Sequence, residues 1–280
     1  MNAIEIRNLK KYYPGFALDI PELILPGGCV MGLIGENGAG KSTAIRLIMD
    51  IACKDGGTVT VLGVDNRDKK FRYTKNDIGV VLDECGFPDS FTVETVEKIM
   101  VRAYRNWNVE HFHELLEKFS IDYFKRIKEL SNGMKMKLSL AVALSHGSKL
   151  LILDEPTNGI DPVARDEIIE MLIDFTRQED HSILISSHIV SDLEKICDYV
   201  AFMHKGNLLV CEEKDILLSR YGLIRCSREE FERIAPDAIK HVRHTDYFSE
   251  VVVLRDKVPE NMNLMPIGIE ELFVAMVREG

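Results

Sequence analysis

A glycine-rich stretch, GENGAGKST, spans residues 35–43 and fits the spacing G-x-x-x-x-G-K-[ST]. Glycines let backbone N–H groups wrap around phosphate oxygens, and a helix that begins near Lys41 points its positive dipole end at the same anion. The ammonium of Lys41 can reach the β- and γ-phosphates, and the hydroxyl of Ser42 can bind Mg²⁺. The motif therefore predicts a nucleoside triphosphate site, with contacts from Gly35, Asn37, Gly38, Ala39, Gly40, Lys41, Ser42 and Thr43.

The alternative to a nucleotide site is a chance glycine turn, and the flanking sequence argues against it. An apolar run, VMGLIG at 30–35, leads into the glycines, and STAIRLIMDIA at 42–52 has apolar residues at helical spacing. A phosphate-binding loop needs such a strand before it and an amphipathic helix after it.

Two adjacent carboxylates, Asp154 and Glu155, follow the apolar run LLIL at 150–153. Short, continuous apolar runs are typical of strands buried on both faces of a parallel sheet. A carboxylate at the end of such a strand can hold Mg²⁺, so Asp154 and Ser42 are predicted metal ligands. The second carboxylate can polarise a water molecule for in-line attack on the γ-phosphate, which makes Glu155 the predicted general base.

A histidine ends the next apolar run, HSILISSH at 181–188. A lone histidine is more often structural, but here the imidazole of His188 could contact the γ-phosphate or hold the attacking water. We predict that His188 acts in catalysis together with Glu155 and Lys41.

The elements that must position these residues follow from the pattern along the chain. Three alternating segments with tight turns precede residue 36, and a helical pattern runs from about 93 to 147 between the apolar strands. This order predicts an α/β core with a helical insert in its middle. After about residue 215 the pattern changes to a small α+β extension. In its last segment, helical spacing predicts a packing face formed by Ile269, Leu272, Phe273, Met276 and Val277.

Composition excludes several classes of protein. Apolar residues make up 46% of the 280 residues and charged residues 29%, as in a folded globular protein. The formal net charge of -10 argues against nucleic acid as the main ligand. No apolar run is long enough to span a bilayer, and the N-terminus lacks the apolar stretch of a signal peptide. The six cysteines form no CxxC pair, so we expect reduced thiols in the cytoplasm.

The order of the motifs resembles that of the ABC-family ATPases, the nucleotide-binding subunits of ABC transporters. The series is GENGAGKST, LSNGM at 130–134, LLILDEP at 150–156, NGID at 158–161 and SSH at 186–188, and the resemblance covers most of residues 3–215. It implies an ABC nucleotide-binding domain at 1–215, with a mixed sheet, an antiparallel β subdomain and a helical subdomain at about 84–147. Residues 216–280 would form an accessory region.

The resemblance also implies roles for residues outside the glycine loop. LSNGM stands in the place of the family's signature, with Ser131 and Gly133 as nucleotide contacts. Asp161 is the aspartate of the family's D-loop, and His188 matches its switch histidine. Tyr13, with Tyr12 as second choice, stands where the family stacks an aromatic ring on adenine; simple strand packing is the equal alternative for both.

The family's mechanism implies partners for this chain. Two such chains pair head to tail, and each ATP lies between the glycine loop of one and the signature of the other. The resemblance favours an exporter subunit that works with a separate integral-membrane permease on the inner face of the membrane. The second ATPase subunit is either a copy or a homologue. The alternative is a soluble ABC ATPase that acts as a switch on ribosomes or nucleic acid.

Two departures from the family's pattern concern the site. The signature has Asn132 and Met134 where the family has glycine and glutamine, although asparagine tolerates unusual backbone angles better than most residues. Asp83 stands where the family usually has a glutamine. Its carboxylate is either a third Mg²⁺ ligand or an ordinary loop residue.

The glycine loop gives the first test. Lys41→Ala should abolish ATP hydrolysis and weaken nucleotide binding, because it removes the cation that neutralises charge developing on the phosphates. Steady-state phosphate release and nucleotide titration measure the two effects. Unchanged turnover would contradict the role of Lys41.

Overall fold

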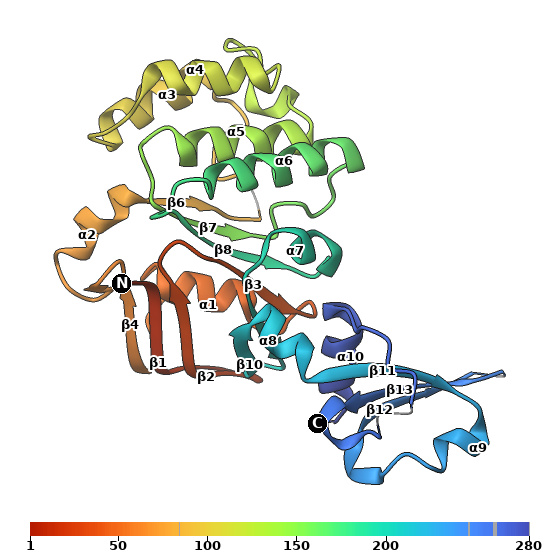
Figure 1. Ribbon diagram of the computed structural model, residues 1–280. Helices are drawn as coiled ribbons and strands as arrows, with labels where there is room; N and C mark the ends of the chain where they lie inside the picture. The colour runs from red at the N-terminus through yellow and green to blue at the C-terminus, as the bar shows by residue number, and fades with distance from the viewer. Residues whose placement is uncertain (84, 246, 260–261, 280) are drawn as a thin grey trace.

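The computed structural model describes residues 1–83, 85–245, 247–259 and 262–279. Its main feature is a ten-stranded mixed sheet with helices packed against it (Figure 1), which confirms the predicted α/β fold. The strand order is β5-β4-β1-β2-β10-β9-β3-β8-β7-β6. The strands are β1 (Asn2–Tyr13), β2 (Phe16–Pro26), β3 (Val30–Gly35), β4 (Gly56–Val61), β5 (Val64–Asp65), β6 (Ile78–Val81), β7 (Leu150–Asp154), β8 (Ser182–Ser187), β9 (Tyr199–His204) and β10 (Asn207–Glu213).

The parallel part of the sheet contains the three apolar runs that the sequence identified. Strand β3 pairs in parallel with β8 and β9, and β7 pairs in parallel with β8 and β6. Every residue of β3, β7 and β8 is buried, because helices cover both faces of this region. The carboxyl ends of these strands meet at one edge of the sheet, where ligands bind in α/β folds.

The antiparallel part comprises β1, β2, β4 and β5. Along β1 the buried residues Ile4, Ile6 and Leu9 face a hydrophobic cluster that includes residues of α1 (Lys41–Ile48). Half-buried strands with one solvent-facing side show this alternation. The hairpin between β1 and β2 pairs Tyr13 with Phe16, so both rings lie at its turn.

A group of helices lies between β6 and β7 in the chain. It contains α3 (Val93–Ala103), α4 (Val109–Lys118) and α5 (Asn132–Leu144), at the top of Figure 1. A polar side chain caps each helix: Thr92, Asn108 and Ser131 accept hydrogen bonds from backbone N–H groups in the first turn. These caps fix where each helix begins. Residue 84, where the sequence places the start of the insert, lies outside the described residues.

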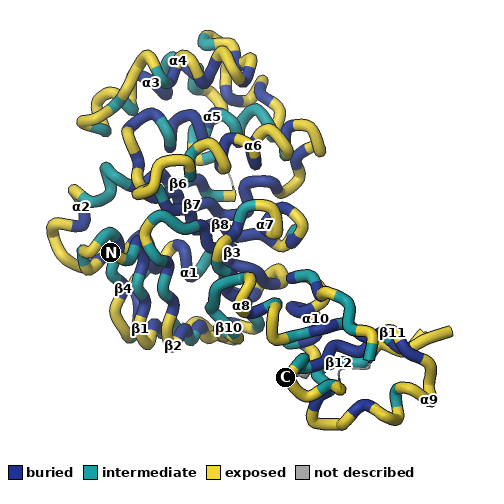
Figure 2. The backbone as a smooth tube through the Cα atoms, viewed as in Figure 1, coloured by how far each residue is buried: buried dark blue, intermediate teal, exposed yellow. Residues whose placement is uncertain are grey.

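A second, three-stranded antiparallel sheet follows the main one in the chain. Its order is β11-β13-β12, and it has a small hydrophobic cluster of its own, visible as dark blue stretches in Figure 2. No helix among the described residues is long and apolar enough to cross a membrane. The remaining elements are α2 (Phe71–Thr74), α6 (Pro162–Phe175), α7 (Val190–Ile196), α8 (Lys214–Ser219), β11 (Tyr221–Cys226), α9 (Arg228–Phe231), β12 (Ile239–His244), β13 (Ser249–Leu254) and α10 (Ile269–Glu279).

The last helix, α10, connects the small sheet to the main one. Its buried face includes Ile269, Leu272 and Phe273, with Met276 and Val277 half-buried, as the helical spacing predicts. The ring of Phe273 meets that of Phe202 in β9 edge to face, with centroids 5.3 Å apart. The N–H of Ile269 donates to the carboxylate of Glu194 in α7 at 2.8 Å. Residues of the main part of the fold therefore contact α10 in two ways: Phe202 packs against its apolar face, and Glu194 accepts the first N–H of the helix.

Candidate functional site

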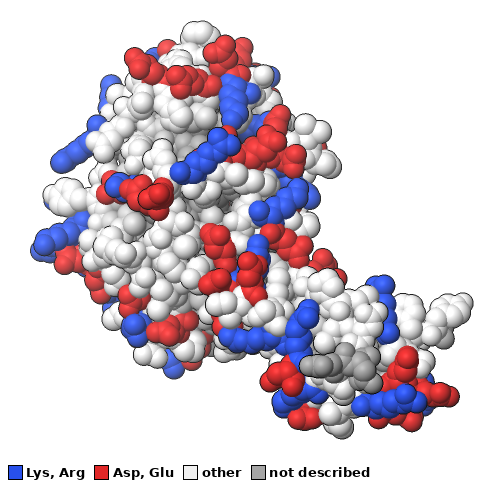
Figure 3. Space-filling model, in the orientation of Figure 1, with Lys and Arg blue, Asp and Glu red and all other residues white. Residues whose placement is uncertain are grey.

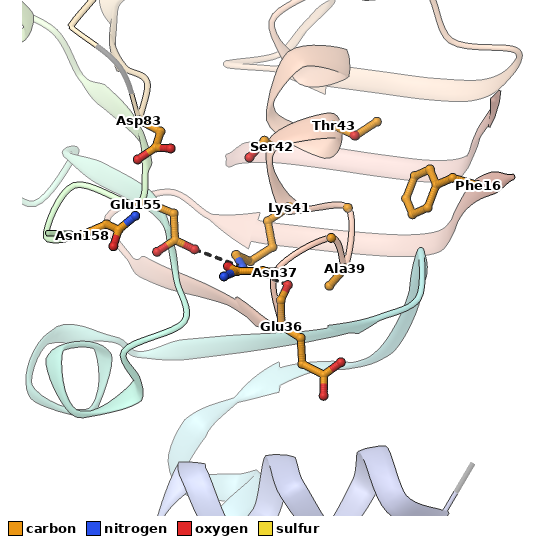
Figure 4. Close-up of a pocket in the computed structure, with 12 residues that line it drawn as sticks. Phe16, Glu36, Asn37, Ala39, Lys41, Ser42, Thr43, Asp83, Glu155 and Asn158 are labelled. Atoms are coloured by element: carbon orange, nitrogen blue, oxygen red, sulfur yellow. Dashed lines mark hydrogen bonds and ion pairs between the residues drawn. The ribbon is translucent and has the colours of Figure 1, made fainter. Parts of the chain in front are cut away.

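The glycine loop between β3 and α1 forms one wall of an open cavity of about 410 Å³ (Figure 4). The opposite wall comes from the loops after β6 and β7. The lining residues are Phe16, Glu36, Asn37, Gly38, Ala39, Gly40, Lys41, Ser42, Thr43, Asp83, Glu155 and Asn158. Seven of the eight predicted loop contacts, Asn37, Gly38 and Lys41 among them, thus line a single cavity together with Glu155, while Gly35 is the last residue of β3.

Backbone geometry explains why this loop needs glycine. Gly38 and Gly40 have φ values of +83° and +105°, which side chains disfavour. A Cβ on Gly40 would also lie only 2.8 Å from Leu18 Cδ1 and 3.0 Å from Phe16 Cζ. Any other residue at position 40 would therefore move the loop away from the β1–β2 hairpin.

The lysine of the loop is buried and directed across the cavity. The ammonium of Lys41 donates to the carbonyl oxygens of Gly35 at 2.7 Å and Glu36 at 3.3 Å. It also forms an ion pair with Glu155 Oε1 at 3.0 Å, drawn as a dashed line in Figure 4. The structure thus joins the cation of the first predicted motif to the carboxylate of the second.

The carboxylate of Glu155 has a second partner, His188. Its Oε2 lies 2.7 Å from His188 Nδ1 and accepts the backbone N–H of His188 at 3.2 Å. Glu155 itself has φ +51°, a left-handed conformation that is strained for a glutamate. Such strain persists only where the surroundings impose it, and here it aims the carboxylate between Lys41 and His188.

The neighbouring Asp154 lies deeper than Glu155. Its side chain is buried, and Asp154 Oδ1 accepts a hydrogen bond from the Ser186 hydroxyl at 2.6 Å. The same hydroxyl accepts the backbone N–H of Glu155 at 3.0 Å. Of the three predicted metal ligands, Ser42 and Asp83 line the cavity, whereas Asp154 does not. Sequence reasoning missed Ser186, although it belongs to the SSH run.

The predicted signature residues lie away from the glycine loop of their own chain. Ser131 and Gly133 begin α5, and neither lines the cavity. A Cβ on Gly133 would lie 3.5 Å from Ile160 Cγ2 and 3.9 Å from Asp161 Oδ2, so the signature packs on the loop before α6. Asp161 caps that helix: its Oδ1 accepts the N–H groups of Val163 and Ala164, both at 3.1 Å.

The adenine contact predicted at Tyr13 is not placed in the cavity. Tyr13 is 43% exposed, its ring centroid lies 6.5 Å from that of Phe16, and the Lys11 ammonium lies 5.2 Å from its ring centroid. Phe16, which the sequence did not single out, lines the cavity instead. The available signal was the Pro14-Gly15 turn, which places Phe16 directly opposite Tyr13. Glu36 and Asn158 are two further lining residues that the analysis missed.

Comparison with known proteins gives consistent matches. A profile of the family described as ABC transporter matches residues 18–158. The chain is 32% identical to the ABC transporter ATP-binding protein YtrB of Bacillus subtilis, over 97% of each chain. It is 33% identical to the bacitracin transport ATP-binding protein BcrA of Enterococcus faecalis, over 74% of this chain and 68% of that one. A solved structure of an ATP-binding subunit of an ABC transporter superposes with a TM-score of 0.70 at 24% identity, covering 78% of this chain and 92% of that one.

The position of Phe16 gives a test of the aromatic contact. Phe16→Ala should weaken nucleotide affinity by about 5- to 100-fold, the range expected for one stacked base. Tyr13→Ala should change it by less than about twofold, because that ring lies outside the cavity. Titration with a fluorescent ATP analogue measures both. A larger loss for Tyr13→Ala than for Phe16→Ala would return the contact to Tyr13.

Proposed function

Because the chain belongs to the ABC transporter family, as an ATP-binding and ATP-hydrolysing subunit, we propose that it drives export through a separate membrane permease. The transport part of this proposal rests on relatives named as bacitracin and lantibiotic transport ATP-binding proteins. The observation that carries the hydrolysis is the Glu155 carboxylate, held between Lys41 and His188 at the edge of the phosphate cavity. The site can cleave a γ-phosphate only when the nucleotide displaces Glu155 from Lys41. Nucleotide binding is therefore coupled to the loss of this ion pair.

The catalytic steps follow from the residues that line the cavity. The phosphates of ATP compete with Glu155 for the ammonium of Lys41, because both are anions beside one buried cation. The carboxylate released from Lys41 remains held by His188 and orients a water molecule for in-line attack. Lys41 and the N–H groups of the glycine loop then stabilise the charge that develops as the γ-phosphoryl group passes to water and its bond to ADP breaks.

We propose that Mg²⁺ accompanies ATP in this cavity. The Ser42 hydroxyl and the Asp83 carboxylate line it together, and oxygen ligands of this kind suit Mg²⁺. Asp154 is buried and accepts a hydrogen bond from Ser186. Its negative charge would stabilise the metal ion without direct contact. When bound, the ion would neutralise charge between the β- and γ-phosphates.

A second ATPase subunit, identical or homologous, would complete the site. The support is that Ser131 and Gly133 do not line the cavity of their own chain. The first N–H groups of α5 have no partners within the helix and can bind an anion. Ser131 Oγ accepts the N–H of Met134, so its own O–H stays available to donate to a γ-phosphate.

We divide the chain into a nucleotide-binding domain at 1–215, with its helical subdomain at about 84–147, and an accessory region at 216–280. In support, the main sheet ends with β10 and the small sheet begins at β11. The subunit would lie on the inner face of the membrane through its permease. The soluble-switch alternative is not favoured, since the relatives are named as transporter subunits.

The general-base assignment has a direct test. Glu155→Gln should bind ATP but stall hydrolysis, because an amide cannot take a proton from water. The closed dimer should then accumulate with ATP on a sizing column and dissociate when ADP replaces ATP. A variant that stays monomeric and hydrolyses ATP normally would show that Glu155 is not the base.

The permease has a separate test. The full chain, tagged and purified from the membranes of its native cells in detergent, should carry an integral-membrane protein at a fixed molar ratio. We expect association because relatives of this chain are named as ATP-binding proteins of transporters. Mass spectrometry identifies the partner. A chain found only in the soluble fraction, or bound to ribosomes, would overturn the transporter assignment in favour of the switch.

A further inference from the structure

We propose that an ion pair between Lys137 and Glu167 holds the signature helix α5 against α6, so that Ser131–Gly133 and the loop 158–161 reach a partner's nucleotide as one unit. The inference rests on the proposed dimer, in which both segments act across the interface. Neither Lys137 nor Glu167 lines the cavity at the glycine loop. They are positioning residues.

The first element of the unit is close packing between the two helix starts. A Cβ on Gly133 would lie 3.5 Å from both Ala164 Cβ and Ile160 Cγ2, so backbone at the signature rests on α6 and the loop before it. Ile160 and Ala164 are buried there in the same hydrophobic cluster as Met136. A displacement of either segment therefore pushes directly on the other.

The ion pair lies one turn further along the same seam. Lys137 follows Gly133 by four residues, and Glu167 follows Ala164 by three, so each lies on the face of its helix that carries the apolar contact. The Lys137 ammonium pairs with Glu167 Oε2 and lies 5.8 Å from the ring centroid of buried Phe119. Contacts at two successive turns fix both the distance and the angle between α5 and α6.

The surroundings of Lys137 distinguish this pair from ordinary surface pairs. Its side chain is only 12% exposed, so the ammonium is largely removed from water. Glu167, at 49% exposed, is the accessible partner. A cation that is largely removed from water loses more when its carboxylate is neutralised than an exposed one does.

The chain also supplies a matched control. Asp166, the neighbour of Glu167 on α6, pairs with Lys195 of α7 at 3.4 Å, and these side chains are 65% and 57% exposed. The pair thus joins α6 to α7 and not to α5. Asp166→Asn thus removes the same charge from the same helix without affecting the seam.

The experiment uses the full chain in the Glu155→Gln background. The ATP concentration that gives half-maximal dimer should rise about fivefold in Glu167→Gln and in Lys137→Gln, and stay within about twofold in Asp166→Asn. Affinity of the monomer for a fluorescent ADP analogue should not change, because the pair is remote from the glycine loop. The exchanged pair, Lys137→Glu with Glu167→Lys, should restore most of the dimerisation. Unchanged dimerisation in both single variants would overturn the proposal.

Amide hydrogen exchange of the monomer tests the same pair without a dimer. Glu167→Gln should raise exchange together at 131–136 and 158–162, and Asp166→Asn should not. A rise throughout the chain, or at one segment alone, would show that the pair supports general stability and not a joint position. If the parent variant never dimerises with ATP, the proposed function fails, while this measurement still decides whether the two segments are coupled.

Discussion

The Glu155 carboxylate is the interaction on which the rest of the site depends. It meets the ammonium of Lys41 from α1 and the imidazole of His188 from the end of β8. These groups come together because β3, β7 and β8 are adjacent parallel strands that end at one edge of the sheet. The left-handed backbone of Glu155 costs about 1–3 kcal/mol, which two hydrogen bonds offset locally: Glu155 donates its N–H to the Ser186 hydroxyl and accepts the N–H of His188.

Most of the fold could be predicted because its buried strands are continuous apolar runs. VMGLIG, LLIL and ILIS predict three neighbouring strands, and the polar residues after them predict the edge where the site forms. The glycine loop could also be predicted from the sequence, because its backbone angles disfavour other residues at Gly38 and Gly40. Constraints of this kind depend on consecutive residues, so a short sequence motif predicts them.

The residues that the sequence did not reveal act through contacts between distant segments. Phe16 reaches the cavity because of hairpin register, and Ser186 reaches Asp154 across two strands. The pair that holds the largely buried Lys137 is of the same kind, because its partner Glu167 comes thirty residues later in the chain. Figure 3 shows how little the charge pattern of the surface helps: acidic and basic side chains lie in scattered small groups between wide areas of other residues. Contacts between residues that are far apart in the sequence could therefore not be predicted.

The cap that Glu194 provides to α10 has a consequence for how the chain is made. Seventy-five residues separate the two ends of this hydrogen bond, so α10 is synthesised well after α7 and β9. Because chains fold from the N-terminus during synthesis, α7 and β9 can form while the helix that covers them does not yet exist. Until α10 has been made, the Phe202 ring lacks its contact with Phe273, and the Glu194 carboxylate lacks the N–H of Ile269. A nascent or prematurely terminated chain thus carries an exposed apolar surface that the finished protein buries.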